Sequence, residues 1–367
     1  MIYHIYWGTS GNAGLYLDEI YQVLNRAGYS QKAFVSYYYP FEYGEKIFFH
    51  RSDIAHCKYK SRSRKIVQAY EIIVSLLRIL VAAAKDKPKV INYSLISGSW
   101  AFLVVFLKIL KKISKAKIIV TCHDVCPFGH DINSNDSEIR NRKKIFALAD
   151  YLLVHNENSI SDLKHYFGVD NEKIISHPFP IMDLSKLYKP RVHEKKYDFL
   201  FIGGLRKEKG INFLLDSWPH VIEANPTASL CIAGLKDTCD NFDEDSLSKQ
   251  NVEFHLHYIS DQDFVDYIES SRYVLLPYIK GTNSGIISTV LSLHAKVITS
   301  DIPMFKNNPM LSETEMFEAG NSNAFIDCIL SKLLEKKDNY SEELLISYRR
   351  NFNNKVLEVY KRILGSK

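Results

Sequence analysis

Residues 201–218 read FIGGLRKEKGINFLLDSW, which predicts the end of a strand, a glycine-rich turn and the start of a helix. The paired glycines allow a ligand to approach the backbone closely, and the first N–H groups of a helix attract anions. Gly203, Arg206 and Lys209 are therefore candidate ligands of a diphosphate group. A solvated charged turn is the alternative interpretation of the same residues.

Strands and helices alternate on both sides of this stretch. Before it, strands are predicted at 2–7, 32–38, 90–95, 117–121, 151–155 and 173–177, and after it at 229–233, 252–255, 273–277 and 296–300. Such alternation predicts a parallel sheet with right-handed crossovers in each half of the chain. We therefore expect a first domain over 1–182, a linker over 183–198, a second domain over 199–340 and a terminal helix within 341–367.

Three more loops follow predicted strands at their carboxyl ends, where open α/β sheets bind ligands. A small-residue loop after the first strand contains Gly11 and Asn12. His123 follows the strand 117–121 and could donate a hydrogen bond to a substrate, or it could simply hold its own loop. The loop before a predicted helix at 286–293 lies in a region, 270–300, that contains no acidic residue. That loop therefore favours an anion over a metal ion.

The composition is that of an ordinary globular protein, with 367 residues, 46% apolar residues and 24% charged residues. Its six cysteines are scattered and lack zinc-like spacing, so we expect no metal site and a reducing compartment. The N-terminus lacks the pattern of a signal peptide, which favours a cytoplasmic location.

Positive charge is concentrated in one segment of the chain. Residues 58–117 contain 14 Lys or Arg against two acids, a balance of +12, whereas the whole chain carries +5 and the remainder therefore −7. Such a segment indicates an anionic partner, which could be nucleic acid, a phosphorylated substrate or anionic lipid. The aromatic residues are not interleaved as a stacking platform, so nucleic acid is the weaker alternative.

Two neighbouring stretches of this segment bear on membranes. The uncharged run 91–107 is short for a membrane span and predicts a buried strand followed by a buried helix. The stretch 108–115 places lysines around Ile109, Leu110 and Ile113, which is typical of a helix that lies on a membrane surface. The lysines concerned are Lys108, Lys111, Lys112 and Lys115.

These loops, in this order, resemble those of GT-B glycosyltransferases of family 4 and their close relatives. The pieces that carry the likeness are the first glycine-rich loop, TCHDVCPF, ISHPF, FIGGLRKEKGINFLLDSW, VEFHLHYISDQDFVDYIESSRYVLLPY and GTNSGIISTVLSLHAKVITSD. The resemblance implies an α/β protein with two facing Rossmann-like domains and a C-terminal helix that crosses back to the first domain. The first domain would hold the acceptor and the second the nucleotide-sugar.

The resemblance also implies roles for individual residues. His123 would contact the donor sugar, with Asp124 as a weaker candidate for a catalytic base. Lys209 would pair with the diphosphate, and Tyr258 and Ile259 would border the base. Asn283, Ser284, Gly285 and Thr289 would line the phosphate and sugar positions.

Two departures from the family pattern concern the donor site. Gly204 stands where the family often has arginine, so Arg206 is the expected substitute. Thr282 and Thr289 stand near the places of a pair of glutamates, so hydroxyls would replace carboxylates there. The resemblance implies a metal-independent reaction that retains anomeric configuration, and the lack of an acid pair for magnesium agrees with metal independence. We expect no cofactor besides the donor substrate.

The sequence therefore predicts a glycosyltransferase of the EC 2.4 class. The basic first domain favours a lipid-diphosphate-linked saccharide acceptor and peripheral attachment to an anionic membrane surface on its cytoplasmic face. Bacterial surface polysaccharide biosynthesis, such as O-antigen or capsule assembly, is the process that we expect. A catalytically silent GT-B subunit that binds a partner enzyme, and a nucleic-acid-binding protein, are the alternatives.

Overall fold

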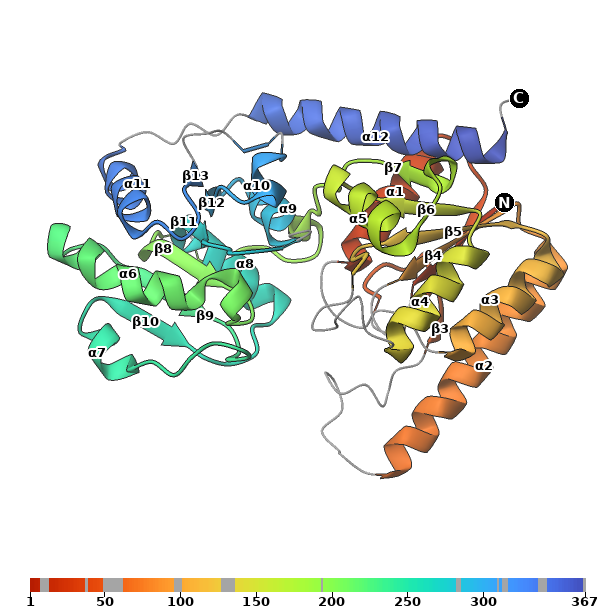
Figure 1. Cartoon of the computed structure of the whole chain (residues 1–367), viewed down its shortest axis with the longest axis horizontal. Coiled ribbons are helices and arrows are strands. Elements are labelled where there is room, and N and C mark those ends of the chain that lie inside the picture. The colour runs from red at the N-terminus through yellow and green to blue at the C-terminus, as the bar shows by residue number, and fades with distance from the viewer. Residues whose placement is uncertain are drawn as a thin grey trace. The chain divides into compact units, whose positions relative to one another are not determined.

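The computed structural model divides the chain into two compact units (Figure 1). Unit 1 comprises Met1–Pro180 and Arg349–Lys367, and unit 2 comprises Ile181–Tyr348. The structure describes residues 1–6, 13–36, 39–48, 62–95, 101–126, 136–192, 194–281, 285–308, 310–311, 316–335 and 342–365.

Unit 1 is built on a seven-stranded parallel sheet of order β3-β2-β1-β4-β5-β6-β7. Its strands are β1 (Ile2–Tyr6), β2 (Gln31–Ser36), β3 (Glu45–Phe48), β4 (Val90–Leu95), β5 (Lys117–Cys122), β6 (Tyr151–Val154) and β7 (Ile174–Ser176). Its helices are α1 (Ala13–Arg26), α2 (Arg62–Asp86), α3 (Ala101–Ser114), α4 (Ser137–Leu148) and α5 (Glu157–Phe167). The order reverses between β1 and β4, which places a switch point there.

Unit 2 repeats this plan with a six-stranded parallel sheet of order β10-β9-β8-β11-β12-β13. Its strands are β8 (Tyr197–Ile202), β9 (Leu230–Ala233), β10 (Val252–His255), β11 (Ser271–Leu276), β12 (Lys296–Ser300) and β13 (Met316–Phe317). Its helices are α6 (Ile211–Ala224), α7 (Glu244–Ser248), α8 (Asp261–Glu269), α9 (Gly285–Ser292), α10 (Pro303–Lys306) and α11 (Ser322–Leu334). Here the switch point lies between β8 and β11.

The central strands are mostly apolar and are buried along their whole length. Every residue of β1 and β4 is buried, as expected for parallel strands that helices cover on both faces. Trp218 of α6 is fully buried over the unit 2 sheet and donates a hydrogen bond from its indole to the Gln250 carbonyl, 2.9 Å away. Burying these apolar faces is the main force that holds each unit together.

The terminal helix α12 (Glu342–Leu364) contributes its residues from Arg349 onward to unit 1. Val356, Tyr360 and Ile363 are fully buried there. The Asn92 amide of β4 donates to the Tyr360 hydroxyl at 3.2 Å, and the Lys117 ammonium of β5 donates to the Ile363 carbonyl at 2.7 Å. The part of the helix from Arg349 onward therefore belongs to the unit 1 core.

The predicted alternation of strands and helices is confirmed, with most boundaries within two residues. The segment 183–198 differs, because it is a packed part of unit 2 and not a linker: Arg191 donates to Asp266 of α8 at 2.6 Å. The sequence analysis also missed β3, which precedes the basic segment 58–117, and α2, which lies within it.

Helix α2 is the longest of the helices in the described residues, with 25 residues. Judged by length and composition alone, its part Ile66–Asp86 could cross a membrane. Only 17% of the most apolar 18-residue stretch of this part is buried in the protein, so it is not an ordinary core helix. The run 91–107, which the sequence analysis considered for this role, divides into β4 and α3 as predicted. However, α3 buries only one of its sides.

Candidate functional site

The glycine-rich turn of unit 2 lies at the switch point of its sheet. It follows β8 and leads through a 3-10 turn, Lys207–Lys209, into α6. Gly203 and Gly210 adopt φ angles of 113° and 73°, which glycine tolerates far better than other residues do. The predicted strand–turn–helix arrangement is therefore present at the edge where α/β sheets bind ligands.

Neighbouring loops pack against this turn backbone to backbone. A Cβ atom on Gly210 would lie 1.7 Å from the Pro277 carbonyl oxygen after β11, and one on Gly234 would lie 1.9 Å from the Gly203 carbonyl oxygen. The Ile279 amide also donates to the Glu208 carbonyl at 2.9 Å. The loops after β8, β9 and β11 are thus fixed to one another.

Lys209 projects over the first glycine of the turn. Its ammonium lies 3.0 Å from the position that a Cβ atom on Gly203 would occupy and 6.0 Å from the centre of the Tyr278 ring. Among the described residues, no carboxylate forms an ion pair with it. Burial, and secondly the charge of Arg206, lower the pKa of Lys209 to about 8. An anion placed beside this ammonium would restore its full charge.

Arg206 and Lys207, in contrast, are engaged in ion pairs. The Arg206 guanidinium donates to the Asp237 carboxylate at 2.6 Å, and the Lys207 ammonium pairs with Asp240 at 2.5 Å. Both pairs are largely exposed and tie this turn to the loop after β9. The sequence analysis offered Arg206 and Lys209 as diphosphate ligands, and the geometry favours Lys209.

The first turn of α9 lies beside the same glycine. The Ile286 side chain would be 3.3 Å from a Cβ atom on Gly203, and the turn beginning at Gly285 contains no acidic residue. Of the other residues predicted here, Asn283 and Ser284 lie outside the described residues. Thr289 is buried, and its hydroxyl donates to the Gly285 carbonyl at 3.1 Å.

Tyr258 and Ile259 follow β10 at the same edge of the unit 2 sheet. The Tyr258 side chain is 61% exposed, whereas Ile259 is partly buried. The next residue, Ser260, caps α8 by accepting a hydrogen bond from the Asp263 amide. An exposed aromatic ring held by a capped helix can stack on a nucleobase, the role that the resemblance implies for this pair.

In unit 1, His123 and Asp124 directly follow β5. Arg142 of α4, which is almost completely buried, donates from its guanidinium to the Asp124 and Val125 carbonyls and to the Glu138 carboxylate. This arginine fixes the backbone that presents His123, and the sequence analysis missed it. Gly11 and Asn12, predicted after β1, lie outside the described residues.

His123 is one member of a cluster of rings at the carboxyl ends of β5, β6 and β7. His155 follows β6, His177 follows β7, and Tyr16 of α1 contacts all three histidines with ring centroids 4.6–6.1 Å apart. His123 and His155 lie 5.5 Å apart, and Phe179 closes the cluster. Three successive strands thus each deliver a histidine to one place.

Hydrogen bonds assign the tautomer of one of these histidines. Nδ1 of His177 lies 2.8 Å from the Pro178 carbonyl, which can only accept, so Nδ1 carries a proton. If the ring is neutral, Nε2 accepts from the Tyr16 hydroxyl at 3.2 Å. Burial is the main cause that lowers the pKa of His123 and His177, each to about 4. His123 is therefore a neutral imidazole near pH 7, suited to hydrogen bonding with an uncharged hydroxyl.

The sequence of the chain matches two family models. Residues 196–335 match the model of glycosyl transferases group 1, and residues 97–179 match that of the glucosyltransferase 3-like N-terminal domain. The first match covers most of unit 2, including the glycine-rich turn and α9, and the second covers the loop of His123. No curated protein matches the sequence.

Solved structures share the fold of the whole chain. The catalytic domain of starch synthase IV from Arabidopsis thaliana, bound to ADP and acarbose, has a TM-score of 0.60 and 12% identity, and the match covers 99% of each chain. Sucrose-phosphate synthase from Thermosynechococcus elongatus has a TM-score of 0.58 and 13% identity, with 99% of this chain and 96% of that chain covered.

A third structure is that of an S. aureus TarM mutant in complex with fondaparinux, α-GlcNAc-glycerol and UDP. Its TM-score is 0.54 and its identity 15%; the match covers 80% of this chain and 59% of the TarM chain, so this protein spans less than two thirds of that relative. These likenesses confirm the predicted GT-B fold. Membership of family 4 in particular stays a prediction.

Replacing Lys209 with alanine should weaken binding of UDP or another nucleoside diphosphate by about ten- to a hundredfold, because a charge-assisted contact contributes about 1.5–3 kcal/mol. Isothermal titration calorimetry measures the change. Lys207→Ala is the matched control, since Lys207 lies on the same turn but is paired with Asp240. Equal affinities of the Lys209 and Lys207 variants would return Lys209 to the role of a solvated lysine.

Nucleoside diphosphate binding should also depend on pH. The protonated, ammonium form of Lys209 binds the diphosphate. This form predominates below the pKa of Lys209, which is about 8, and is lost as the pH rises through that value. Affinity should therefore fall as the pH rises above 8, towards the loss of about ten- to a hundredfold expected for Lys209→Ala. Lys209→Arg keeps its charge at these pH values and should remove the dependence. An unchanged pH profile in that variant would assign the titration to another group.

Proposed function

We propose that this chain, which has the GT-B fold and matches glycosyl transferases group 1 over residues 196–335, transfers a sugar from a nucleoside-diphosphate sugar to a lipid-linked saccharide. The observation that carries the donor assignment is the Lys209 ammonium, which lies over Gly203 beside the first turn of α9. ADP and UDP occur in two of the similar structures, which supports a nucleoside diphosphate as the group held here.

Charge development explains how these groups would promote transfer. The bond between the sugar C1 and the diphosphate oxygen breaks, and negative charge builds on the leaving diphosphate. Lys209 and the N–H groups of the first turn of α9 would stabilise that charge. A new bond forms from C1 to the acceptor oxygen, and the acceptor proton passes to the leaving phosphate oxygen. Departure and attack on one face of the sugar would retain the anomeric configuration.

Metal independence is part of this proposal. Magnesium sites are usually built from carboxylates together with phosphate oxygens. Asp237 and Asp240, the carboxylates that follow β9 near the glycine-rich turn, are already paired with Arg206 and Lys207. The cation and the helix N-terminus would therefore take over the neutralising role that a metal has in other transferases.

The acceptor assignment rests on the charge of unit 1. Residues 58–117, which lie in this unit, carry a balance of +12, and a lipid-linked diphosphate is an anion that such a surface attracts. We place the reaction at the cytoplasmic face of the cell membrane, in the assembly of a bacterial surface polysaccharide such as O-antigen or capsule. His123, neutral and fixed after β5, would hydrogen-bond a sugar hydroxyl.

Release of nucleoside diphosphate from UDP-, GDP-, ADP- and dTDP-sugars, measured with EDTA present, tests the reaction. We expect turnover of at least one donor without divalent metal, and stabilisation of the protein by that donor in thermal unfolding. Turnover that needs added Mg²⁺ or Mn²⁺ would contradict the account of the leaving group. Donor binding without any turnover, in the presence of extracts rich in lipid-linked saccharide, would identify a silent subunit.

His123→Asn should reduce sugar transfer by at least about tenfold while leaving the affinity for free nucleoside diphosphate unchanged, because His123 belongs to unit 1 and the diphosphate turn to unit 2. Transfer kinetics and calorimetry measure the two effects. His165→Asn on α5 is a control, since His165 lies outside the ring cluster. A loss of melting temperature that matches the loss of activity would instead show that His123 only supports the cluster.

A further inference from the structure

Helix α2 exposes an apolar stripe along its length. Ile66, Tyr70, Ile73, Leu77 and Val81 are 55–73% exposed, and we call these five residues the α2 stripe. Their spacing of three and four residues places them on one side of the helix. Contiguous exposed apolar side chains of this size indicate a binding surface.

The opposite side of α2 belongs to the core of unit 1. Ser75, Ile79 and Ala83 are fully buried, and Ile79 and Ala83 pack in the same apolar cluster as Tyr3 and Phe34 of the sheet. If α2 crossed a bilayer, these residues would leave that cluster and uncover it. The helix is therefore held on the protein, with its stripe turned outward.

Helix α3 lies beside α2 and extends this surface (Figure 1). Phe102, Val105, Ile109 and Ile113 are 38–56% exposed. The expected ridge of Ile109, Leu110 and Ile113 needs correction, because Leu110 is completely buried. Lys111 also differs from the prediction: its ammonium pairs with Asp150 at 2.8 Å and donates to the Leu148 carbonyl, so it holds α3 to the protein.

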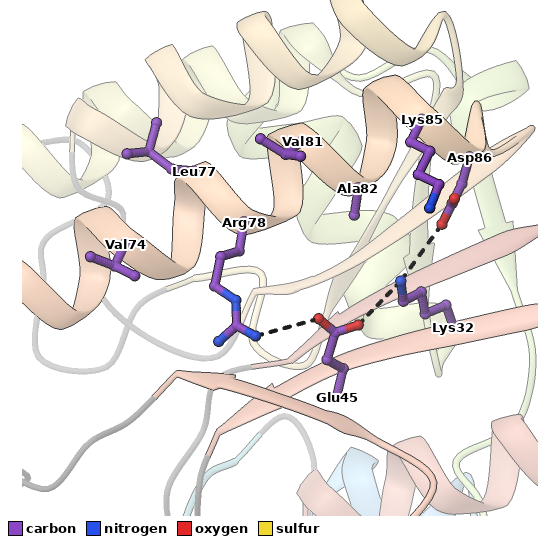
Figure 2. Close-up of a pocket in the computed structure, with 9 residues that line it drawn as sticks. All are labelled: Lys32, Glu45, Val74, Leu77, Arg78, Val81, Ala82, Lys85 and Asp86. Atoms are coloured by element: carbon purple, nitrogen blue, oxygen red, sulfur yellow. Dashed lines mark ion pairs between the residues drawn. The ribbon is translucent and has the colours of Figure 1, made fainter.

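A hollow of about 440 Å³ adjoins the stripe, between α2 and the strands β2 and β3 (Figure 2). Leu77 and Val81 belong both to the stripe and to its wall. Figure 2 shows Arg78 turned toward the Glu45 carboxylate, which Lys32 also pairs with at 3.1 Å. Lys32 also pairs with Asp86 at 3.6 Å, so two carboxylates and three cations stand around the apolar wall formed by Val74, Leu77, Val81 and Ala82, and the hollow keeps a net positive charge beside that wall.

The charge around the α2 stripe indicates whether a membrane or a second copy of the protein binds there. The described residues 66–95 and 101–126 contain nine Lys or Arg and three acids. Lys85, Lys108, Lys112 and Lys115 are exposed and make no ion pair with any described residue. Two copies meeting through this surface would bring like charges together, whereas anionic lipid headgroups would neutralise them.

We propose that the α2 stripe and the exposed side of α3 dock unit 1 on an anionic phospholipid bilayer, with α2 lying in the plane of the interface. The apolar side chains would enter the boundary between headgroups and acyl chains, and the exposed lysines would contact the headgroups. The hollow beside Leu77 would accommodate part of an acyl chain. This inference deepens the proposed function, on which it rests for the lipid-linked acceptor.

Vesicle co-sedimentation of the full chain tests the surface. We compare phosphatidylcholine vesicles with vesicles that also contain phosphatidylglycerol, at low and high salt. The wild type should bind the anionic vesicles, and Ile73→Glu/Leu77→Glu/Val81→Glu should bind them at least about tenfold more weakly. Leu334→Glu/Ile346→Glu is the matched control, because those apolar residues are also exposed but belong to unit 2. Lys108→Glu/Lys112→Glu/Lys115→Glu should remove the salt-sensitive part of the binding.

The stripe variant should keep the melting temperature and the UDP affinity of the wild type, which would show that the variant is folded. Binding of the stripe variant equal to that of the wild type, or no binding of the wild type to anionic vesicles at low salt, would overturn the proposal. A wild-type dimer that the stripe variant converts to a monomer, without vesicle binding, would assign the stripe to a second copy. Donor turnover is measured in parallel. If vesicle binding is intact but no donor is turned over, the proposed function is wrong and the proposed membrane surface stands.

Discussion

Direct backbone contact at the carboxyl edge of the unit 2 sheet determines the rest of the donor site. No side chain fits at Gly210 or Gly234, because a Cβ atom there would overlap a carbonyl oxygen of the neighbouring loop. The loops after β8, β9 and β11 can therefore pack together at the switch point and carry Lys209 and the first turn of α9 to the same glycine. A flexible turn would have to order on each binding event, whereas this one is already in place.

The two units use burial in different ways. In unit 2, burial lowers the pKa of Lys209 but leaves its ammonium without a carboxylate partner among the described residues, so an anion would gain a strong contact. In unit 1, burial keeps His123 and His177 neutral, and the Tyr16 hydroxyl and the Pro178 carbonyl satisfy His177. Lys209 is thus placed where an anion could bind, whereas His123 is a neutral ring that can hydrogen-bond an uncharged group.

Helix α2 has a buried side that stabilises unit 1 and an exposed side that could bind a membrane. Its buried side contributes Ile79 and Ala83 to the core of unit 1, and its exposed stripe is too apolar for an ordinary solvated helix. A sequence alone could equally assign the basic residues of this segment to nucleic acid. Of the described ones, Lys85 lies on α2, Lys108 and Lys112 on α3, and Lys115 directly after α3. Their combination with exposed aliphatic side chains is what favours lipid over a hydrophilic polyanion.

Local patterns in the sequence determined the strands of both sheets except β3 and β13, and gave the positions of β4, β10 and β12 without error. Paired glycines and nearby cations marked the turn with Lys209. These features depend on residues close together in the chain. The sequence also placed His123 after a strand. Only the tertiary structure decided that Arg206 pairs with Asp237, that Leu110 is buried, and that Arg142, Tyr16, His155 and His177 surround or support the His123 loop. Ion pairing, burial and ring contacts join residues far apart in sequence, so no local pattern contains them.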